Sequence, residues 1–337
     1  MNIFGYIRGI FPCESPALSI QESMIKRYAE VHGMELKEIY KDTLKRKRTI
    51  QDINAASKLG IAEQRYHYVY PELEHLMLDI AGGNADIILV DIRERLYGVN
   101  YEHYKKYKEV IVQNHVRVIE VGKTPLLVEN SNNVFIYHST NDSTKRPINL
   151  LKQMDEIYEA TYSRGWVASC ISLDASKNKR PEYKKYKDLL EGIDRENVVA
   201  MFYSFRHFSN HINVVIDSLY EWSNKGIDIH TVSDKVDIKV KRADEYLQRH
   251  LKVAVYERNG EPLFGDIVRT YCRTKSSWEV YGIYDDVYTM VRQKDYYDVI
   301  VVKRVSDISD NTGDFLSLKK TIGHTLVYEL YKERMIV

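Results

Sequence analysis

Two arginines stand where a phosphate could be bound. Arg8 lies near the end of an apolar strand predicted over residues 2–9, and Arg95 follows a strand predicted over residues 85–92. Open α/β sheets bind their ligands at the carboxyl ends of parallel strands. The guanidinium group is planar and always charged, so it suits a phosphate. We therefore expect Arg8 and Arg95 to line one pocket as an exposed pair.

Motifs for nucleotide cofactors and for metals are absent from the sequence. No Gly-x-Gly-x-x-Gly follows a predicted strand, and no Gly-x-x-x-x-Gly-Lys occurs. The eleven histidines form no ligand motif, and Cys13, Cys170 and Cys272 are far apart. We therefore expect neither a metal, nor a cofactor, nor a disulfide framework.

Composition limits the class of protein. The 337 residues are enough for two or three domains, and 49 Lys and Arg against 48 Asp and Glu give a net charge of +1. No apolar run approaches membrane-spanning length, so we expect a cytoplasmic protein with no membrane partner. Lys41–Ile50 is a local basic segment, although such charge runs are mostly solvated loops.

The elements that must position the arginines alternate between β-branched strands and longer amphipathic helices, in three successive rounds. The predicted strands are 2–9, 34–42, 85–92 and 116–122, then 132–140, 167–174, 197–205 and 227–233, then 251–260, 278–286, 296–305 and 324–330. The predicted helices are 19–33, 70–84 and 101–114, then 148–165, 180–194 and 211–226, then 263–277, 287–295 and 314–323. This order predicts an α/β protein of tandem, doubly wound domains with mainly parallel sheets.

The joints between the rounds set the predicted domain boundaries. One joint lies near residues 124–132, and the other lies near residues 235–249. We predict domains over 1–127, 128–247 and 248–337. The polar segment 235–250 is expected to be a helical connector at the end of the second domain.

The first round carries a set of motifs with a family pattern. The motifs are Tyr6-Ile7-Arg8-Gly9-Ile10, Ser19-Ile20-Gln21, a strand ending in Asp42, Tyr70-Pro71-Glu72-Leu73 and Arg95-Leu96-Tyr97-Gly98. They resemble the catalytic domain of serine recombinases, the resolvase and invertase group, whose patterns are Tyr-x-Arg-x-Ser, Ser-x-Gln, Arg-Pro-x-x and Arg-Leu-x-Arg. The chain departs from the family at the serine, at the arginine before proline and at the second arginine of the last motif.

The later rounds keep other parts of the pattern. In the second, Ser139 falls on the arginine position, Arg180-Pro181 is intact, and either Arg206 or His207 takes the place of Arg95. In the third, Asp307 and Asp310 stand where the two arginines belong. The resemblance thus implies three degenerate, resolvase-like domains, the third being the shortest.

The resemblance also implies a chemistry. In the family a serine hydroxyl attacks a DNA phosphodiester without a metal, while arginines stabilise the charge on the phosphate. Here the nucleophile position holds Ile10, Asn141 and Gly260, none of which offers a hydroxyl. The retained family positions are Arg8, Gln21, Asp42, Arg95, Arg180 and Arg206.

The resemblance therefore implies a resolvase-family protein associated with DNA binding and site-specific recombination, with strand cleavage lost or impaired. One alternative is an active recombinase with a displaced nucleophile, for which Ser15 and Ser139 are candidates. The other is a protein-interaction scaffold with no DNA role. The expected partners are DNA, a protein of a recombination complex, or a second copy of the chain.

Overall fold

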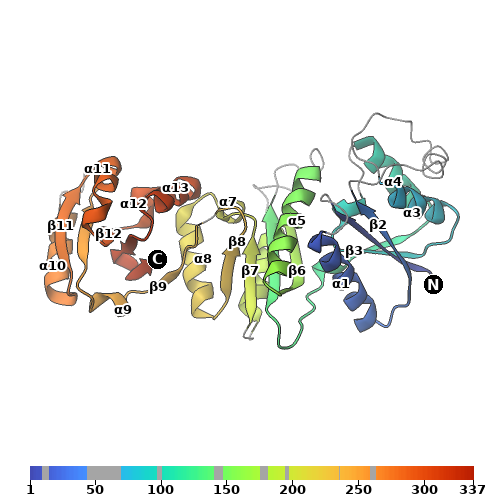
Figure 1. Ribbon diagram of the computed structural model, residues 1–337, viewed down its shortest axis with the longest axis horizontal. Helices are drawn as coiled ribbons and strands as arrows, with labels where there is room; N and C mark the ends of the chain where they lie inside the picture. The colour runs from blue at the N-terminus through green and yellow to red at the C-terminus, as the bar shows by residue number, and fades with distance from the viewer. Residues whose placement is uncertain are drawn as a thin grey trace. The chain divides into compact units, whose positions relative to one another are not determined.

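A computed structural model describes residues 1–9, 15–43, 70–96, 101–139, 147–174, 181–193, 197–234, 236–258 and 263–337. Contacts divide the chain into two compact units, Met1–Tyr203 and Ser204–Val337. Figure 1 shows that each unit contains β-strands with helices packed on them. The predicted α/β class is confirmed, whereas the exact three-domain boundaries stay a prediction.

The first sheet has the strand order β2-β1-β3-β4, and all its pairs are parallel. Its central strands are apolar and buried, as expected for strands covered on both faces. The strands are β1 (Ile3–Gly9), β2 (Leu36–Thr43), β3 (Ile87–Val90) and β4 (Arg117–Glu120). The helical segments are α1 (Pro16–Val31), α3 (Pro71–Ala81), η1 (Arg93–Leu96), α4 (Tyr101–Gln113) and η2 (Val121–Lys123).

The second sheet repeats this topology in the order β6-β5-β7-β8. Strand β5 pairs in parallel with both β6 and β7. The strands are β5 (Asn133–Ser139), β6 (Val167–Asp174), β7 (Val198–Phe202) and β8 (Asp228–Thr231). The helices are α5 (Pro147–Ser163), α6 (Pro181–Gly192), α7 (Phe205–Phe208) and α8 (Ile212–Asn224).

The third sheet begins with the same pattern, β11-β10-β12-β13, and then adds β14 and β9 in antiparallel pairs. The strands are β9 (Val240–Arg242), β10 (Lys252–Tyr256), β11 (Glu279–Tyr284), β12 (Val299–Val302), β13 (Leu326–Glu329) and β14 (Arg334–Ile336). The helical segments are α9 (Asp244–Leu247), α10 (Phe264–Lys275), α11 (Val287–Arg292), η3 (Lys294–Tyr296), α12 (Val305–Ile308), α13 (Thr312–Ile322) and η4 (Leu330–Lys332).

The first strand of each repeat holds the same place in its sheet. Strands β1, β5 and β10 each lie between the second and third strands of their own repeat. Each also has a register shift against its outer neighbour, at Ile3/Phe4, Val134/Phe135 and Val253/Ala254. Three sheets that share both the strand order and this irregularity support the prediction of a tandem arrangement.

The predicted connector helix is wrong. Within the described residues 236–250, only Asp244–Leu247 is helical, while Val240–Arg242 forms β9 and pairs with β14. The cause lies in the alternation of Val236, Ile238 and Val240 with charged residues, because a period of two favours a strand. Strand β14 was not predicted from the sequence. It follows β13, which corresponds to the last predicted strand.

Inside the second unit, equivalent parts of the second and third repeats meet. Helices α8 and α13 begin at Ile212 and Thr312 and pack together. The Ile212 N–H donates to the Asp310 carbonyl at 3.4 Å, and the Thr312 N–H donates to the Asn210 carbonyl at 2.9 Å. Between these bonds, His211 and Asn311 form an antiparallel bridge.

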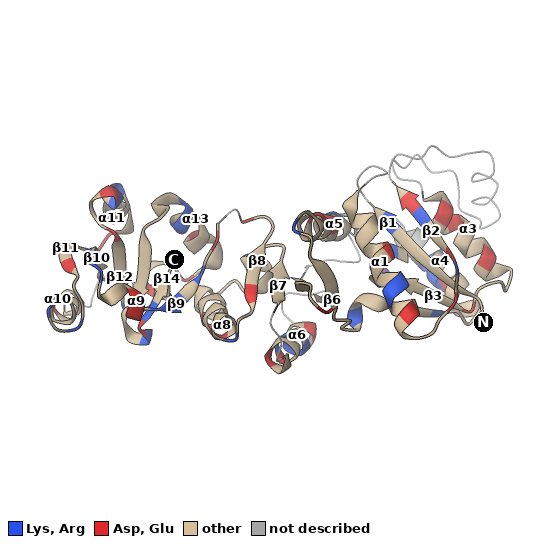
Figure 2. Cartoon of the chain, turned by 60° about the horizontal axis from the view of Figure 1, so that its bottom comes forward, with Lys and Arg blue, Asp and Glu red and all other residues tan. Residues whose placement is uncertain are grey.

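Charged residues of both signs are spread over the described helices and strands, as Figure 2 shows, in keeping with a net charge of +1. Within the described ranges, no helix is long and apolar enough to cross a membrane.

Candidate functional site

Arg8 lies at the end of β1, and its side chain is 1% exposed. The Arg8 N–H donates to Gln21 Oε1 at 3.0 Å, and Gln21 Nε2 donates back to the Arg8 carbonyl at 3.2 Å. Gln21 on α1 therefore fixes the end of the strand. The guanidinium donates to the Glu94 carbonyl at 3.2 Å and lies 4.3 Å from the centre of the Tyr70 ring.

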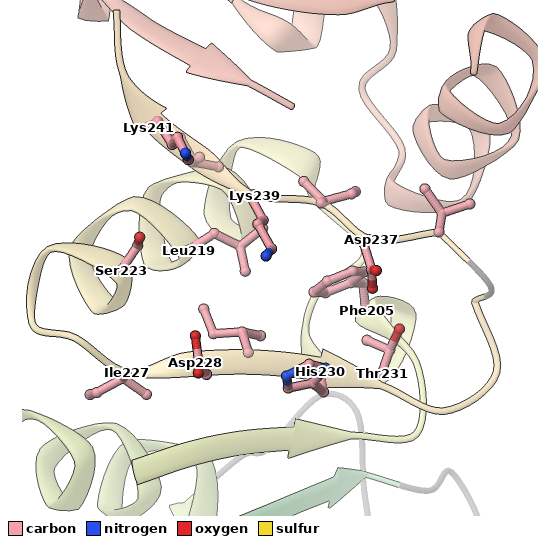
Figure 3. Close-up of a pocket in the computed structure, with 14 residues that line it drawn as sticks. Phe205, Leu219, Ser223, Ile227, Asp228, His230, Thr231, Asp237, Lys239 and Lys241 are labelled. Atoms are coloured by element: carbon pink, nitrogen blue, oxygen red, sulfur yellow. The ribbon is translucent and has the colours of Figure 1, made fainter. Parts of the chain in front are cut away.

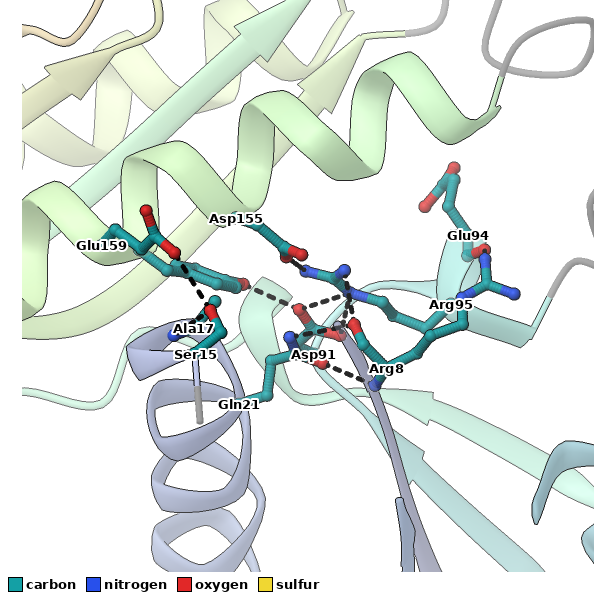
Figure 4. A network of polar contacts seen from close by, with 10 residues as sticks. Arg8, Ser15, Ala17, Gln21, Asp91, Glu94, Arg95, Asp155 and Glu159 are labelled. Carbon is teal, nitrogen blue, oxygen red and sulfur yellow. Dashed lines mark hydrogen bonds and ion pairs between the residues drawn. The ribbon is translucent and has the colours of Figure 1, made fainter. Parts of the chain in front are cut away.

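Arg95 lies on η1, directly after β3, and its side chain is completely buried. Figure 4 shows its guanidinium among three acceptors. Nε lies 3.2 Å from Asp91 Oδ2, one terminal nitrogen donates to the Arg8 carbonyl at 2.8 Å, and the other lies 2.8 Å from Asp155 Oδ1. Tyr158 donates to Asp91 Oδ2 at 2.8 Å, so the carboxylate is held as well.

The electrostatics of this cluster keep Arg95 charged. Burial alone would lower the Arg95 pKa, but the charges of Asp155 and Asp91 outweigh it and raise the pKa. Both carboxylates are themselves fully buried. To bind a phosphate, Arg95 would first have to leave two ion pairs, so the arrangement favours a structural role.

The expectation of an exposed arginine pair is therefore wrong. Arg8 and Arg95 do lie side by side at the carboxyl end of the first sheet, but both are buried. The physical reason is that Asp155 comes from α5 of the second repeat, which packs against α1. The packing of the second repeat on the first encloses the position at which a phosphate was expected.

The two serines proposed as displaced nucleophiles are also buried. Ser15 is the N-cap of α1: its hydroxyl accepts from the Ala17 N–H at 3.2 Å and donates to Glu159 Oε1 at 3.1 Å. Ser139 ends β5 with no exposed side-chain surface. A nucleophile must meet its phosphate in line at about 3 Å, and neither hydroxyl is presented to solvent for that contact.

Asp42, at the end of β2, organises the start of a helix. It accepts the N–H groups of Glu72 and Leu73, at 3.1 and 2.8 Å, and the hydroxyl of Tyr6 at 2.8 Å. Burial raises the pKa of Asp42 to about 6, although these bonds and the nearby charge of Arg8 oppose the rise. The carboxylate thus caps α3 and ties it to the buried tyrosine of β1.

The second repeat contains the same device. Asp174 ends β6 and accepts the N–H groups of Glu182 and Tyr183 on α6, at 3.1 and 3.0 Å. The hydroxyl of Tyr137 on β5 donates to Asp174 at 2.9 Å. The tyrosine and aspartate positions of the family pattern therefore hold strand ends to helix starts in both repeats.

Arg206 is exposed, at the start of α7. Its guanidinium packs directly on Gly313, where an added Cβ would lie 2.5 Å from Arg206 Nε. A side chain at this position would meet the end of the flexible Arg206 side chain, which would have to shift to make room. Counted from the ends of β3 and β7, at Val90 and Phe202, the residue equivalent to Arg95 is His207.

Four predicted positions lie outside the described residues. They are Arg180 and the three nucleophile positions, Ile10, Asn141 and Gly260. Of the predicted positions within the described residues, Arg8, Gln21 and Arg95 come together, whereas Asp42 forms its own contacts with Tyr6 and α3.

The residues that sequence reasoning missed are the acidic partners of Arg95. Asp91 directly follows the buried strand β3, and a charged residue in that place could have been recognised from the sequence as a candidate partner of Arg95. Asp155 lies on α5 between Met154 and Tyr158, on the buried face of an amphipathic helix. A charge on such a face needs a partner, but the sequence does not say that the partner is Arg95, sixty residues away.

A separate cavity of about 320 Å³ lies within the second unit. Figure 3 shows Asp228, His230 and Thr231 on β8 facing the segment that carries Asp237 and Lys239. Both signs of charge line the cavity. None of the described family positions lines it, although Phe205, the neighbour of Arg206, does. In the described part of the chain, no group of three or more His, Cys, Asp or Glu could hold a metal ion.

Comparison with known proteins gives no match: no family model, no curated protein and no solved structure corresponds to this chain. The likeness to serine recombinases therefore rests on the sequence motifs.

Proposed function

We propose that this chain is a degenerate, tandem protein of the serine recombinase group that associates with DNA or with recombination complexes and does not cleave DNA strands. The observation that carries the loss of cleavage is the burial of Arg95 between Asp91 and Asp155.

The loss of cleavage follows from what phosphoryl transfer requires. The reaction needs a positioned nucleophile and positive charge aimed at the phosphate. Ile10 supplies no hydroxyl at the nucleophile position. The guanidinium of Arg95 is held by protein carboxylates, and Ser15, a substitute hydroxyl, is bound as a helix cap. Both requirements are therefore unmet in the first repeat.

Association with DNA is supported by the resemblance and by one local feature of the sequence. Lys41–Ile50 contains five Lys and Arg residues within a chain of net charge +1. Backbone phosphates dominate the affinity of proteins for DNA. A protein of near-zero charge would thus have to bind through such a local segment, with few phosphate contacts.

The test measures DNA binding by the full chain as a function of salt. We expect weak binding to duplex DNA whose affinity falls with a slope of about one logarithmic unit per phosphate contact. Replacing Lys45, Arg46, Lys47 and Arg48 with glutamine should flatten this slope. The matched control replaces four exposed lysines elsewhere, Lys26, Lys105, Lys152 and Lys185, and should leave the slope almost unchanged.

Cleavage is measured on the same samples. Incubation with nicked and intact duplex DNA should give no covalent adduct, because the nucleophile position lacks a hydroxyl. A phosphoserine link to DNA at any serine would overturn the proposed loss of cleavage. Absence of DNA binding by the wild type at low salt would overturn the DNA role.

A protein-interaction scaffold is the second candidate function. It is favoured by a specific observation: buried arginines join neighbouring repeats, Arg95 to Asp155 in the first unit and Arg334 to Asp217 in the second. Surfaces at strand ends are thus used for protein contacts. A wild type that binds no DNA would make this function the leading one.

A further inference from the structure

Strands β2, β6 and β11 occupy the same place in the three repeats. Each is the outermost strand beside the first strand of its sheet. An outermost strand offers unpaired N–H and C=O groups to other chains, so proteins usually protect it with charges or cover it. The three equivalent edges can therefore be compared directly.

The edge of the first repeat is protected by charge. Lys37, Glu38 and Lys41 are exposed along β2, and Tyr40 is the buried residue between them. Charged side chains on an edge strand disfavour pairing with a second strand because pairing would desolvate them.

The edge of the second repeat is covered. The Leu126 N–H donates to the Ser169 carbonyl of β6 at 3.1 Å. The Arg27 guanidinium on α1 donates to the Ala168 carbonyl at 2.6 Å. The segment after η2 and helix α1 thus occupy the outer side of this strand.

The edge of the third repeat carries a single exposed charge, Glu279 at its start, against three on β2, and no other described segment pairs with its outer side. Figures 1 and 2 both show β11 as the outermost strand of its sheet. Tyr281 and Ile283 are 45% and 37% exposed. Tyr281 stacks in parallel on Tyr296, which is 60% exposed, with the ring centres 5.9 Å apart.

Opposite charges mark the two ends of β11. Arg273 and Lys275, in the last turn of α10, are exposed and precede the start of the strand, where Glu279 is exposed as well, so two positive charges and one negative charge leave this end net positive. Asp285 and Asp286, which are also exposed, follow its end. An identical strand running antiparallel would place the basic end of each copy against the acidic end of the other, whereas a parallel strand would place like charges together.

We propose that the β11 edge binds a second copy of this chain, by antiparallel pairing of β11 with β11 about a two-fold axis. The contact is self-complementary, as such a symmetric interface must be. It joins the two third sheets through main-chain hydrogen bonds, and Tyr281 and Ile283 of both copies pack across the strands. The proposal is independent of DNA binding.

The test is the oligomeric state of the full chain, measured by sedimentation equilibrium over a wide concentration range. The wild type should form dimers. The double variant Tyr281→Lys/Ile283→Lys, which copies the protection seen on β2, should raise the dissociation constant about tenfold or more, because each change acts twice in the dimer. The exposed residue Val214, on α8, gives the matched control Val214→Lys, which should dimerise like the wild type.

The antiparallel direction has its own test. Arg273→Glu/Lys275→Glu should weaken the dimer, since acidic groups would then meet at both ends of the strand pair. Adding Asp285→Lys to that variant should restore dimerisation, and Asp286 is kept because it caps α11. A monomeric wild type, an undiminished dimer in the double lysine variant, or a failure of Asp285→Lys to restore the dimer would each overturn the proposal.

Discussion

Arg95 in the first unit and Arg334 in the second show the same arrangement with different burial. Each arginine binds one carboxylate of its own repeat and one from a neighbouring repeat. Arg95 pairs with Asp91 and Asp155, and Arg334 pairs with Glu329, at 2.5 Å, and with Asp217, at 2.6 Å.

The two clusters differ in their access to water. Every group in the Arg95 cluster is fully buried, whereas the Asp217 side chain is 42% exposed and also receives Lys332. Water can replace a lost partner only where it can reach the charge, so removal of one partner costs most in the buried cluster. The comparison teaches that burial, more than the number of ion pairs, sets the energetic weight of such a contact.

The largest effect is expected from Asp155→Ala. Loss of this carboxylate leaves a buried guanidinium with Asp91 as its one charged partner among the described residues, so the unfolding free energy of the first unit should fall by about 3–5 kcal/mol. Urea unfolding checks the value. Lys152→Ala, an exposed change on the same helix, should stay within about 0.5 kcal/mol of the wild type. Equal effects of the two variants would contradict the role given to burial.

A pH effect at Asp42 tests burial at a carboxylate that forms no ion pair with another described residue. Its pKa is raised to about 6, so its contribution to stability is present below its ordinary pKa and is lost as the pH rises through about 6. Between the ordinary pKa of an aspartate and about pH 6, the unfolding free energy of the wild type should therefore fall by about 2–3 kcal/mol relative to that of Asp42→Asn. Thermal unfolding at a series of pH values measures the difference. The exposed change Glu38→Gln on the same strand is the control, and a pH-independent difference for Asp42→Asn would refute the assignment.

The smallest effect is expected from Asp217→Ala. Because the carboxylate is half exposed, the unfolding free energy of the second unit should fall by only about 1 kcal/mol, and by less at high salt. Burial would raise the Asp217 pKa, but the bonds from Lys332 and Arg334 outweigh it and lower the pKa. This contribution is therefore present at neutral pH and is lost as the pH falls below the ordinary value. Asn224→Ala, another exposed change on α8, is the control for urea unfolding, and a loss as large as that of Asp155→Ala would break the comparison.

Much of the fold could be predicted because its signals are local. The buried strands β3 and β12 are apolar at every position, and glycines such as Gly33 and Gly165 mark helix ends with positive φ values of 61° and 67°. The short segments η1, α7 and α12 were missed because the four residues of each are too few to show a helical period.

The candidate site was predicted only in part because its energetics depend on distant residues. The sequence placed Arg8 and Arg95 near each other, and the structure brings them together, with Gln21 bonded to Arg8 as well. Their burial depends on Asp155, in another repeat, and on how α5 packs against α1. No periodicity or spacing within the first repeat carries that information.

The bridge between His211 and Asn311 joins two equivalent positions in opposite directions, with a matching hydrogen bond on either side. Such a contact has the local symmetry of a homodimer, yet both halves belong to one polypeptide. A substitution in a true homodimer alters both sides of the axis at once, whereas here each side mutates alone. The linked halves can therefore differ in sequence, and at this bridge the two equivalent positions hold a histidine, His211, and an asparagine, Asn311.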